Sequence, residues 1–211
     1  MPETQSTAET PVEIKISRPS LAEINQEELK SLIADFAKET YKPIQGGEHD
    51  VQEDIDLYTK IIFELIAQNK FYIAKHEDKI IGFVGLQPKG QKPDKPGRNV
   101  FEIRFVYTVP EHRERKVSKQ LESRFQADLE AEDPSAILIV GSENPIILSH
   151  YEKIGFREEI DPGIVYQTLV SKEGMTKVLA DRIRDFVDTR AADPEFKFLF
   201  YDSEEKTETP S

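Results

Sequence analysis

The sequence contains no cysteine, which excludes disulfide bonds and thiolate chemistry. It also lacks a long apolar run, since segments such as 137–140 fall far short of the roughly 18 residues that a membrane helix needs. The first residues lack the charged start and apolar middle of a secretory signal peptide. We therefore expect a cytoplasmic protein without a membrane partner.

Signals of several other chemistries are also missing. The four histidines show no metal-ligand spacing, so we expect no metal, and neither a Walker loop nor a Ser-His-Asp arrangement is recognisable. Basic residues number 28 against 40 acidic ones, giving a formal net charge of −12 at pH 7. Such a surface repels nucleic acid, so we expect no nucleic-acid partner. The excess either serves solubility alone or draws an amine-bearing substrate, and both interpretations stay open.

The apolar patterns that are present predict one α/β (α+β) domain over residues 12–170. Residues 1–11 and 203–211 are polar and without periodicity, which is typical of disordered tails. Residues 171–202 are predicted to form a C-terminal helix and a candidate strand. If that strand, residues 196–201, is an exposed apolar edge, it favours pairing with a second copy, so a homodimer is a further prediction.

Alternating apolar residues predict strands, and apolar residues at helical spacing predict helices. The predicted strands are 12–16, 71–75, 79–86, 100–109, 136–140 and 196–201. The predicted helices are 21–36, 55–69, 117–129, 145–154 and 173–190. Prolines and glycines predict loops at 43–47 and 87–98, and 156–160 with 164–170 is predicted to be a hairpin.

Basic residues surround the predicted start of the helix at Val117. They are His112, Arg113, Arg115, Lys116 and Lys119. A helix start exposes unpaired N–H groups and the positive end of its dipole, and so it binds phosphate well. The cluster indicates an anion site, with a solvated helix end paired to Glu111 and Glu114 as the alternative.

A second constellation lies on the predicted helix 145–154. Asn144 suits the N-cap, Pro145 the first helical position and Gly155 the stop. Tyr151 follows Asn144 by seven residues, so the two share a helix face. On its own, such a tyrosine is more often a core residue whose hydroxyl is satisfied than a catalyst.

Together these segments resemble the GNAT (N-acetyltransferase) superfamily. The family motif Q/R-x-x-G-x-G/A corresponds to Arg113-Glu-Arg-Lys116-Val-Ser118, with Lys116 and Ser118 in place of the glycines. The later Y-x-K-x-G-F motif is matched at every fixed position by 151–156. The hairpin 71–86 also resembles the family's second and third strands. The resemblance implies a mixed, mostly antiparallel twisted sheet flanked by helices on both faces.

The resemblance also implies a function: acetyl transfer from acetyl-CoA to a primary amine of a small molecule, a lysine or a protein N-terminus. It makes Tyr151 the general acid and Glu102 the general base, although Glu102 is equally consistent with a solvent-facing strand residue. Asn144 either caps its helix or binds the cofactor. The residues implied to bind acetyl-CoA are Val106, Tyr107, Thr108, Arg113, Glu114, Arg115, Lys116, Val117, Ser118, Lys119 and Asn144.

An alternative of another class is a non-catalytic GNAT-like module that binds an acyl-CoA or a protein partner. Lys116 favours this alternative, because glycine at that position lets the backbone approach the pyrophosphate closely.

Overall fold

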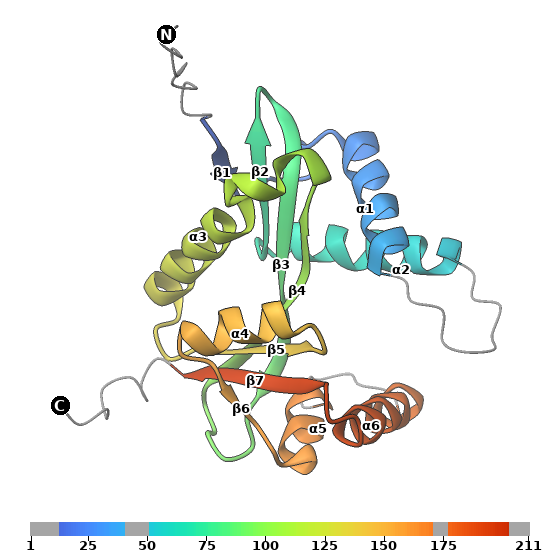
Figure 1. Cartoon of the computed structure of the whole chain (residues 1–211), viewed down its shortest axis with the longest axis vertical. Coiled ribbons are helices and arrows are strands. Elements are labelled where there is room, and N and C mark those ends of the chain that lie inside the picture. The colour runs from blue at the N-terminus through green and yellow to red at the C-terminus, as the bar shows by residue number, and fades with distance from the viewer. Residues whose placement is uncertain (1–12, 41–50, 171–176, 203–211) are drawn as a thin grey trace, which may run out of the picture.

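The computed structural model describes residues 13–40, 51–170 and 177–202. Their strands form a seven-stranded sheet in the order β1-β2-β3-β4-β5-β7-β6 (Figure 1). Only β4 and β5 pair in parallel; the other neighbours are antiparallel. The strands are β1 Lys15–Ser17, β2 Phe71–His76, β3 Lys79–Gln91, β4 Asn99–Thr108, β5 Ile137–Ser142, β6 Arg157–Glu158 and β7 Lys197–Asp202. The predicted fold class is confirmed.

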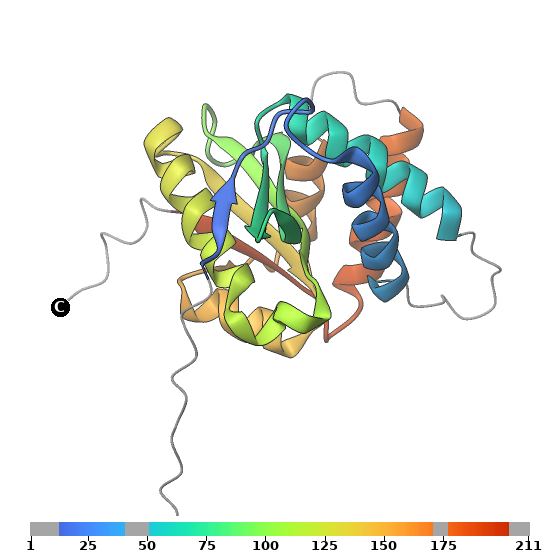
Figure 2. The same ribbon diagram turned by 90° about the horizontal axis from the view of Figure 1, so that it is seen from above.

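Helices cover both faces of this sheet, α3 and α4 on one face and α1, α2, α5 and α6 on the other (Figures 1 and 2). The side chains of β5 show the division, since Leu138 packs in one core with α3 and α4 while Ile137 packs in another with α5 and α6. The helices are α1 Gln26–Thr40, α2 Val51–Ala67, α3 Val117–Glu132, α4 Pro145–Lys153, α5 Pro162–Val170, α6 Lys177–Ala191 and the 3₁₀ helix η1 Pro110–Arg115.

The predicted hairpin after Phe156 is wrong. Residues 164–170 lie in helix α5, and β6 pairs with β7 instead. Asp161 starts α5, because its side chain accepts a hydrogen bond from the Gly163 N–H at 2.8 Å. The buried Val165 and Leu169 then follow at a spacing of four. A short apolar run fits a buried helix and a buried strand equally well, so periodicity alone does not separate them.

Two other predictions on the chain change in detail. The predicted loop 87–98 begins as a continuation of β3, which runs to Gln91. The predicted strand 196–201 is confirmed as β7, but it lies between β5 and β6 rather than at the sheet edge. The reason for expecting a homodimer is therefore weakened, and the homodimer stays a prediction. The tails 1–11 and 203–211 and the loop 43–47 lie outside the described residues.

β4 carries an irregularity that opens the sheet. Ile103 packs with α3, whereas Phe105, two residues on, packs with α1 and α2 on the opposite face. Residues two apart normally share a face. The register with β3 shifts between Gly85↔Arg104 and Phe83↔Tyr107, so β4 holds one extra residue there. Phe105 has a positive φ of 55°, and the segment is a β-bulge.

Gly82 lets β3 and β4 approach closely beside this bulge. A Cβ on Gly82 would lie 2.8 Å from the carbonyl oxygen of Tyr107, a backbone atom fixed by strand pairing. We expect Gly82→Ala to lower the free energy of unfolding by about 1–3 kcal/mol, measured by urea denaturation. Gly141→Ala is the matched control, because the three atoms nearest to the added Cβ belong to the side chains of Phe196 and Phe198 and not to the backbone. Equal losses in both variants would contradict this account.

Candidate functional site

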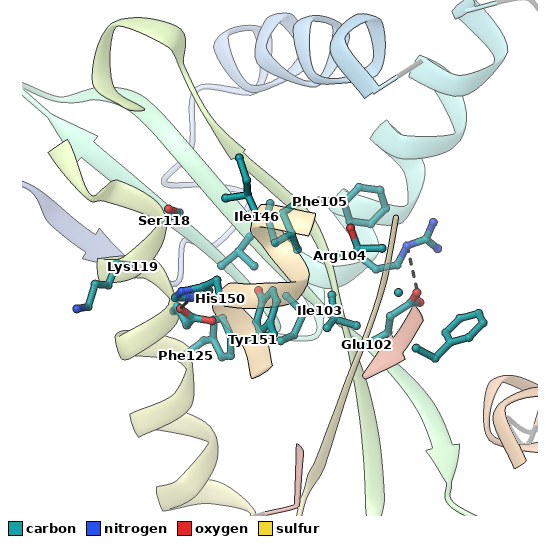
Figure 3. Close-up of a pocket in the computed structure, with 18 of the residues that line it drawn as sticks. Glu102, Ile103, Arg104, Phe105, Ser118, Lys119, Phe125, Ile146, His150 and Tyr151 are labelled. Atoms are coloured by element: carbon teal, nitrogen blue, oxygen red, sulfur yellow. Dashed lines mark hydrogen bonds and ion pairs between the residues drawn. The ribbon is translucent and has the colours of Figure 1, made fainter. Parts of the chain in front are cut away.

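A cleft of about 690 Å³ lies where β4 and β5 separate (Figure 3). Within the described residues, β5 pairs with β4 at Val100–Glu102 and with no later part of β4. The cleft takes side chains from both faces of the sheet. Its lining includes Glu102, Arg104 and Val106 from β4, Lys116, Ser118, Lys119 and Glu122 at and after the start of α3, His150 and Tyr151 from α4, and Phe186, Phe196 and Phe198 from the C-terminal segment.

The start of α3 is open. No side chain among the described residues caps it, so the first N–H groups, from Val117 to Lys119, have no partner within the helix. Lys116 stands at the N-cap with φ 57° and ψ 32°, the left-handed conformation that glycine adopts without strain. The helix start thus has the backbone geometry that the predicted anion site requires, and the anion site stays a prediction.

Four of the five predicted basic residues divide into two groups around this helix start, whereas His112 lines neither hollow. Lys116 and Lys119 line both the cleft and a neighbouring hollow of about 540 Å³, which Arg115 and Arg124 also line. Arg113 lines the cleft but is held elsewhere, since its Nε donates to the Thr108 carbonyl at 3.1 Å and its guanidinium pairs with Glu39. Positive charge is thus concentrated at the first turn of α3, with Lys116 directly before it and Lys119 within it.

Tyr151 belongs to α4, and its side chain lines the cleft. Its side chain is 6% exposed, and burial, followed by the negative charge of Glu122, raises the pKa of the Tyr151 hydroxyl. Asn144 accepts a hydrogen bond from the Ile146 N–H at 2.9 Å, so it caps α4 as one of its two predicted roles requires. That cap fixes the helix that places Tyr151.

Glu102 sits on the opposite side of the cleft. Its carboxylate lies 2.8 Å from Lys89 Nζ and 3.7 Å from Arg104 Nε, and the side chain is 19% exposed. Burial alone raises the pKa of Glu102, but the charges of Arg104 and Lys89 outweigh burial and lower it. Glu102 is therefore an ionised carboxylate that is paired with Lys89 and Arg104, and not a freely solvated strand residue.

A sequence model of the acetyltransferase (GNAT) family matches residues 29–156, more than half of the chain. The chain belongs to the GNAT family. No curated protein sequence matches it significantly.

Solved GNAT structures share the fold at low identity. PaiA N-acetyltransferase from Thermoplasma acidophilum, solved with coenzyme A, is 18% identical with a TM-score of 0.58, covering 90% of this chain and 99% of that chain. A GNAT acetyltransferase from Staphylococcus aureus is 17% identical, with a TM-score of 0.55 and coverages of 90% and 99%. N-acetylglutamate synthase from Neisseria gonorrhoeae, solved with coenzyme A and N-acetyl-glutamate, is 13% identical, with a TM-score of 0.54 and coverages of 92% and 36%.

Several residues that the GNAT resemblance singled out do not put their side chains into the cleft. Tyr107 packs in the core with α1 and α2, and Val117 is fully buried beneath α3. Glu114 is exposed and lines neither hollow. Thr108 does not line the cleft either, and its buried Oγ1 has no hydrogen-bond partner in the described part of the chain. If these four residues contact a ligand in the cleft, they do so through backbone groups.

Sequence reasoning missed Glu122, His150 and the phenylalanines of the C-terminal segment. One signal was available for Glu122, because it precedes Phe125 by three residues and Leu129 by seven. An acidic residue thus interrupts the buried face of α3. No comparable signal marked Phe186 or Phe198, since their place in the cleft depends on β7 entering the sheet beside β5.

The described residues contain neither a membrane-spanning helix nor a metal-binding cluster. Their helices include none with the length and apolar character needed to cross a membrane. In the same residues, no three histidine or acidic side chains gather in a way that would hold a metal ion.

The left-handed Lys116 gives a stability prediction for this GNAT site. That conformation costs a non-glycine residue about 1–2 kcal/mol, which a glycine would not pay. The gain is reduced because a glycine loses more chain entropy on folding, at a cost of roughly 0.5–1 kcal/mol. We expect Lys116→Gly to raise the free energy of unfolding by up to about 1 kcal/mol in urea denaturation. Lys119→Gly, inside the helix, should lower it by about 1 kcal/mol. A loss in both variants would rule out strain at Lys116.

Proposed function

We propose that the protein transfers an acetyl group from acetyl-CoA to a primary amine by direct attack. One observation carries this proposal: the unpaired side of β4, the open start of α3 and the buried Tyr151 all face one cleft. The cleft volume of about 690 Å³ also lies within the range of roughly 300–1,000 Å³ typical of small-molecule sites.

The groups around α3 fit the phosphates of coenzyme A. Free N–H groups at Val117–Lys119 offer donors at the positive end of the helix dipole. Lys116 and Lys119 add ammonium groups beside them, and Arg115 and Arg124 line the adjoining hollow. The coenzyme A complex of the Thermoplasma structure supports the same ligand for this fold.

β4 supplies the remaining donors. Beyond Glu102, the side of β4 that faces β5 has no strand partner among the described residues, so its backbone groups are left for a ligand. When bound there, acetyl-CoA supplies a thioester whose carbonyl carbon an amine can attack. N–H groups aimed at the carbonyl oxygen stabilise the negative charge that develops during attack.

Tyr151 and Glu102 approach the reacting centre from opposite faces of the sheet (Figure 3). We assign Tyr151 the delivery of a proton to the departing sulfur. Glu102 takes a proton from the incoming ammonium, directly or through water. Arg104 and Lys89 hold Glu102 ionised, and their positive charges also favour the neutral, nucleophilic form of a nearby amine.

A non-catalytic acyl-CoA-binding module is the second candidate, and Lys116 in a glycine position of the motif favours it. A screen of amines with acetyl-CoA, read by mass spectrometry, separates the two. Acetylation of an amine supports the enzyme, whereas stabilisation by acetyl-CoA without turnover of any amine supports the module.

Tyr151→Phe tests the assignment of the acid. The variant keeps the ring that contacts Phe156 but removes the proton donor. We expect kcat to fall about 10²–10⁴-fold, with the affinity for acetyl-CoA measured by calorimetry unchanged within a factor of about two. A kcat equal to that of the unmodified protein would remove Tyr151 from the chemistry.

Glu102→Gln tests the assignment of the base. Because amines become neutral in solution as pH rises, the need for a base is greatest at low pH. We expect kcat/KM to fall about 10²-fold at the acidic end of the profile and progressively less toward alkaline pH. Glu130→Gln, an exposed change on α3, is the control. A loss of the same size at every pH would contradict the role of Glu102 as a base.

A further inference from the structure

A second buried carboxylate, Glu122, lies beside the proposed acid. It is 8% exposed on α3 and lines the cleft together with Tyr151. Its Oε2 accepts a hydrogen bond from His150 Nε2 at 2.6 Å, while its Oε1 is buried and has no hydrogen-bond partner among the described residues. Burying a carboxylate in an apolar cleft costs free energy unless the charge is paired, and only one of the two Glu122 oxygens has a partner here.

These three side chains form a path from the cleft to solvent. Tyr151 is almost fully buried, and the negative charge of Glu122 acts on its hydroxyl. His150 follows as the neighbour of Tyr151 on α4, with the two ring centroids 5.3 Å apart (Figure 3). The His150 side chain is 44% exposed, so its ring reaches solvent. One end of the path thus lies in the cleft and the other faces solvent.

Tyr151 needs such a path because it holds its own proton tightly. Burial and Glu122 raise the pKa of its hydroxyl above the ordinary tyrosine value, whereas an ordinary thiol titrates near about 8.5. A tyrosine that simply surrendered its proton to a thiolate would leave a buried tyrosinate beside a carboxylate. Donation becomes favourable when the hydroxyl receives a second proton as it gives up the first.

We propose that His150 and Glu122 form a proton relay that reloads Tyr151 during departure of the thiolate; this relay rests on the proposed acetyl transfer. The His150 imidazolium passes its Nε2 proton to the Glu122 carboxylate at Oε2. The carboxyl group, neutral for that moment, delivers the same proton to the Tyr151 oxygen and becomes a carboxylate again. Tyr151 breaks its own O–H bond as the S–H bond of coenzyme A forms. The net change is one proton moved from imidazolium to sulfur, and water then reprotonates His150.

The charges around the relay come from three elements of the cleft. β4 contributes Glu102 and Arg104, η1 contributes Arg113, and α3 contributes Lys119 together with its N-cap residue Lys116. Within the described part of the chain, none of these side chains forms a hydrogen bond or ion pair with Glu122 or His150, and Glu102 is already paired with Lys89. Glu122 and His150 therefore act through Tyr151 and not through the proposed base.

Chemical rescue distinguishes a relay from a structural contact. The full-length protein and the variants Glu122→Gln, His150→Ala, Tyr151→Phe and Glu130→Gln are assayed with acetyl-CoA and an accepted amine, with and without added imidazole. We expect Glu122→Gln and His150→Ala each to lower kcat at least tenfold, with KM for acetyl-CoA unchanged within about twofold. Added imidazole should restore much of the activity of His150→Ala, because His150 is partly exposed, and none of the activity of the Glu122 and Tyr151 variants.

Three results would overturn the relay. Full activity in Glu122→Gln or His150→Ala, in the presence of an active unmodified protein, would refute it while leaving the proposed acetyl transfer intact. Imidazole rescue of Glu122→Gln would show that the carboxylate carries no proton. An unmodified protein that acetylates no amine would remove the proposed function and the relay with it. Thermal unfolding of each variant identifies a loss of fold, and Glu122→Gln keeps the side-chain shape if His150→Ala proves unstable.

Discussion

Parallel pairing between β4 and β5 stops at Glu102, and the rest of the site depends on the gap that follows. The bulge at Phe105 reverses the alternation of side chains along β4. Ile103 therefore packs with α3 on one face, while Phe105 packs with α1 and α2 on the other. Backbone groups that a continuous sheet would have paired are thereby left facing a cleft. Side chains from both faces of the sheet enter the same space, which allows a donor and an acceptor to approach from opposite sides.

Electrostatics divide the cleft into parts with different tasks. The protein is strongly acidic, yet Lys116, Lys119 and the open first turn of α3 make one end positive. Deeper in the cleft two carboxylates remain, and each has a specific neighbour: Glu102 has Lys89, and Glu122 has His150. The first pair is an ordinary ion pair that fixes a negative charge. The second joins a carboxylate and an imidazole beside Tyr151, which suits it to a different task.

The sequence predicted the parts of the fold that follow a single periodicity, such as β2 and the buried face of α3, and the motif at Tyr151 led to the correct family. It failed at residues 164–170, where an apolar run fits either a strand or a helix. It also missed the bulge at Phe105 and the pairing of Glu122 with His150. Both depend on contacts between segments far apart in the chain, which a local pattern does not contain.

We propose that the N–H groups at the start of α3 hold the phosphates of acetyl-CoA. A titration with acetyl-CoA, followed by thermal unfolding, is the most direct test of this binding. At 100 times Kd the unmodified protein should gain about 2.7 kcal/mol. Ser118→Asp places a carboxylate among these N–H groups. That variant should lose the gain, yet without ligand it should be at least as stable, since a first-turn carboxylate favours the helix dipole by about 0.3–1 kcal/mol. No gain in the unmodified protein, or the same gain in both proteins, would contradict the account.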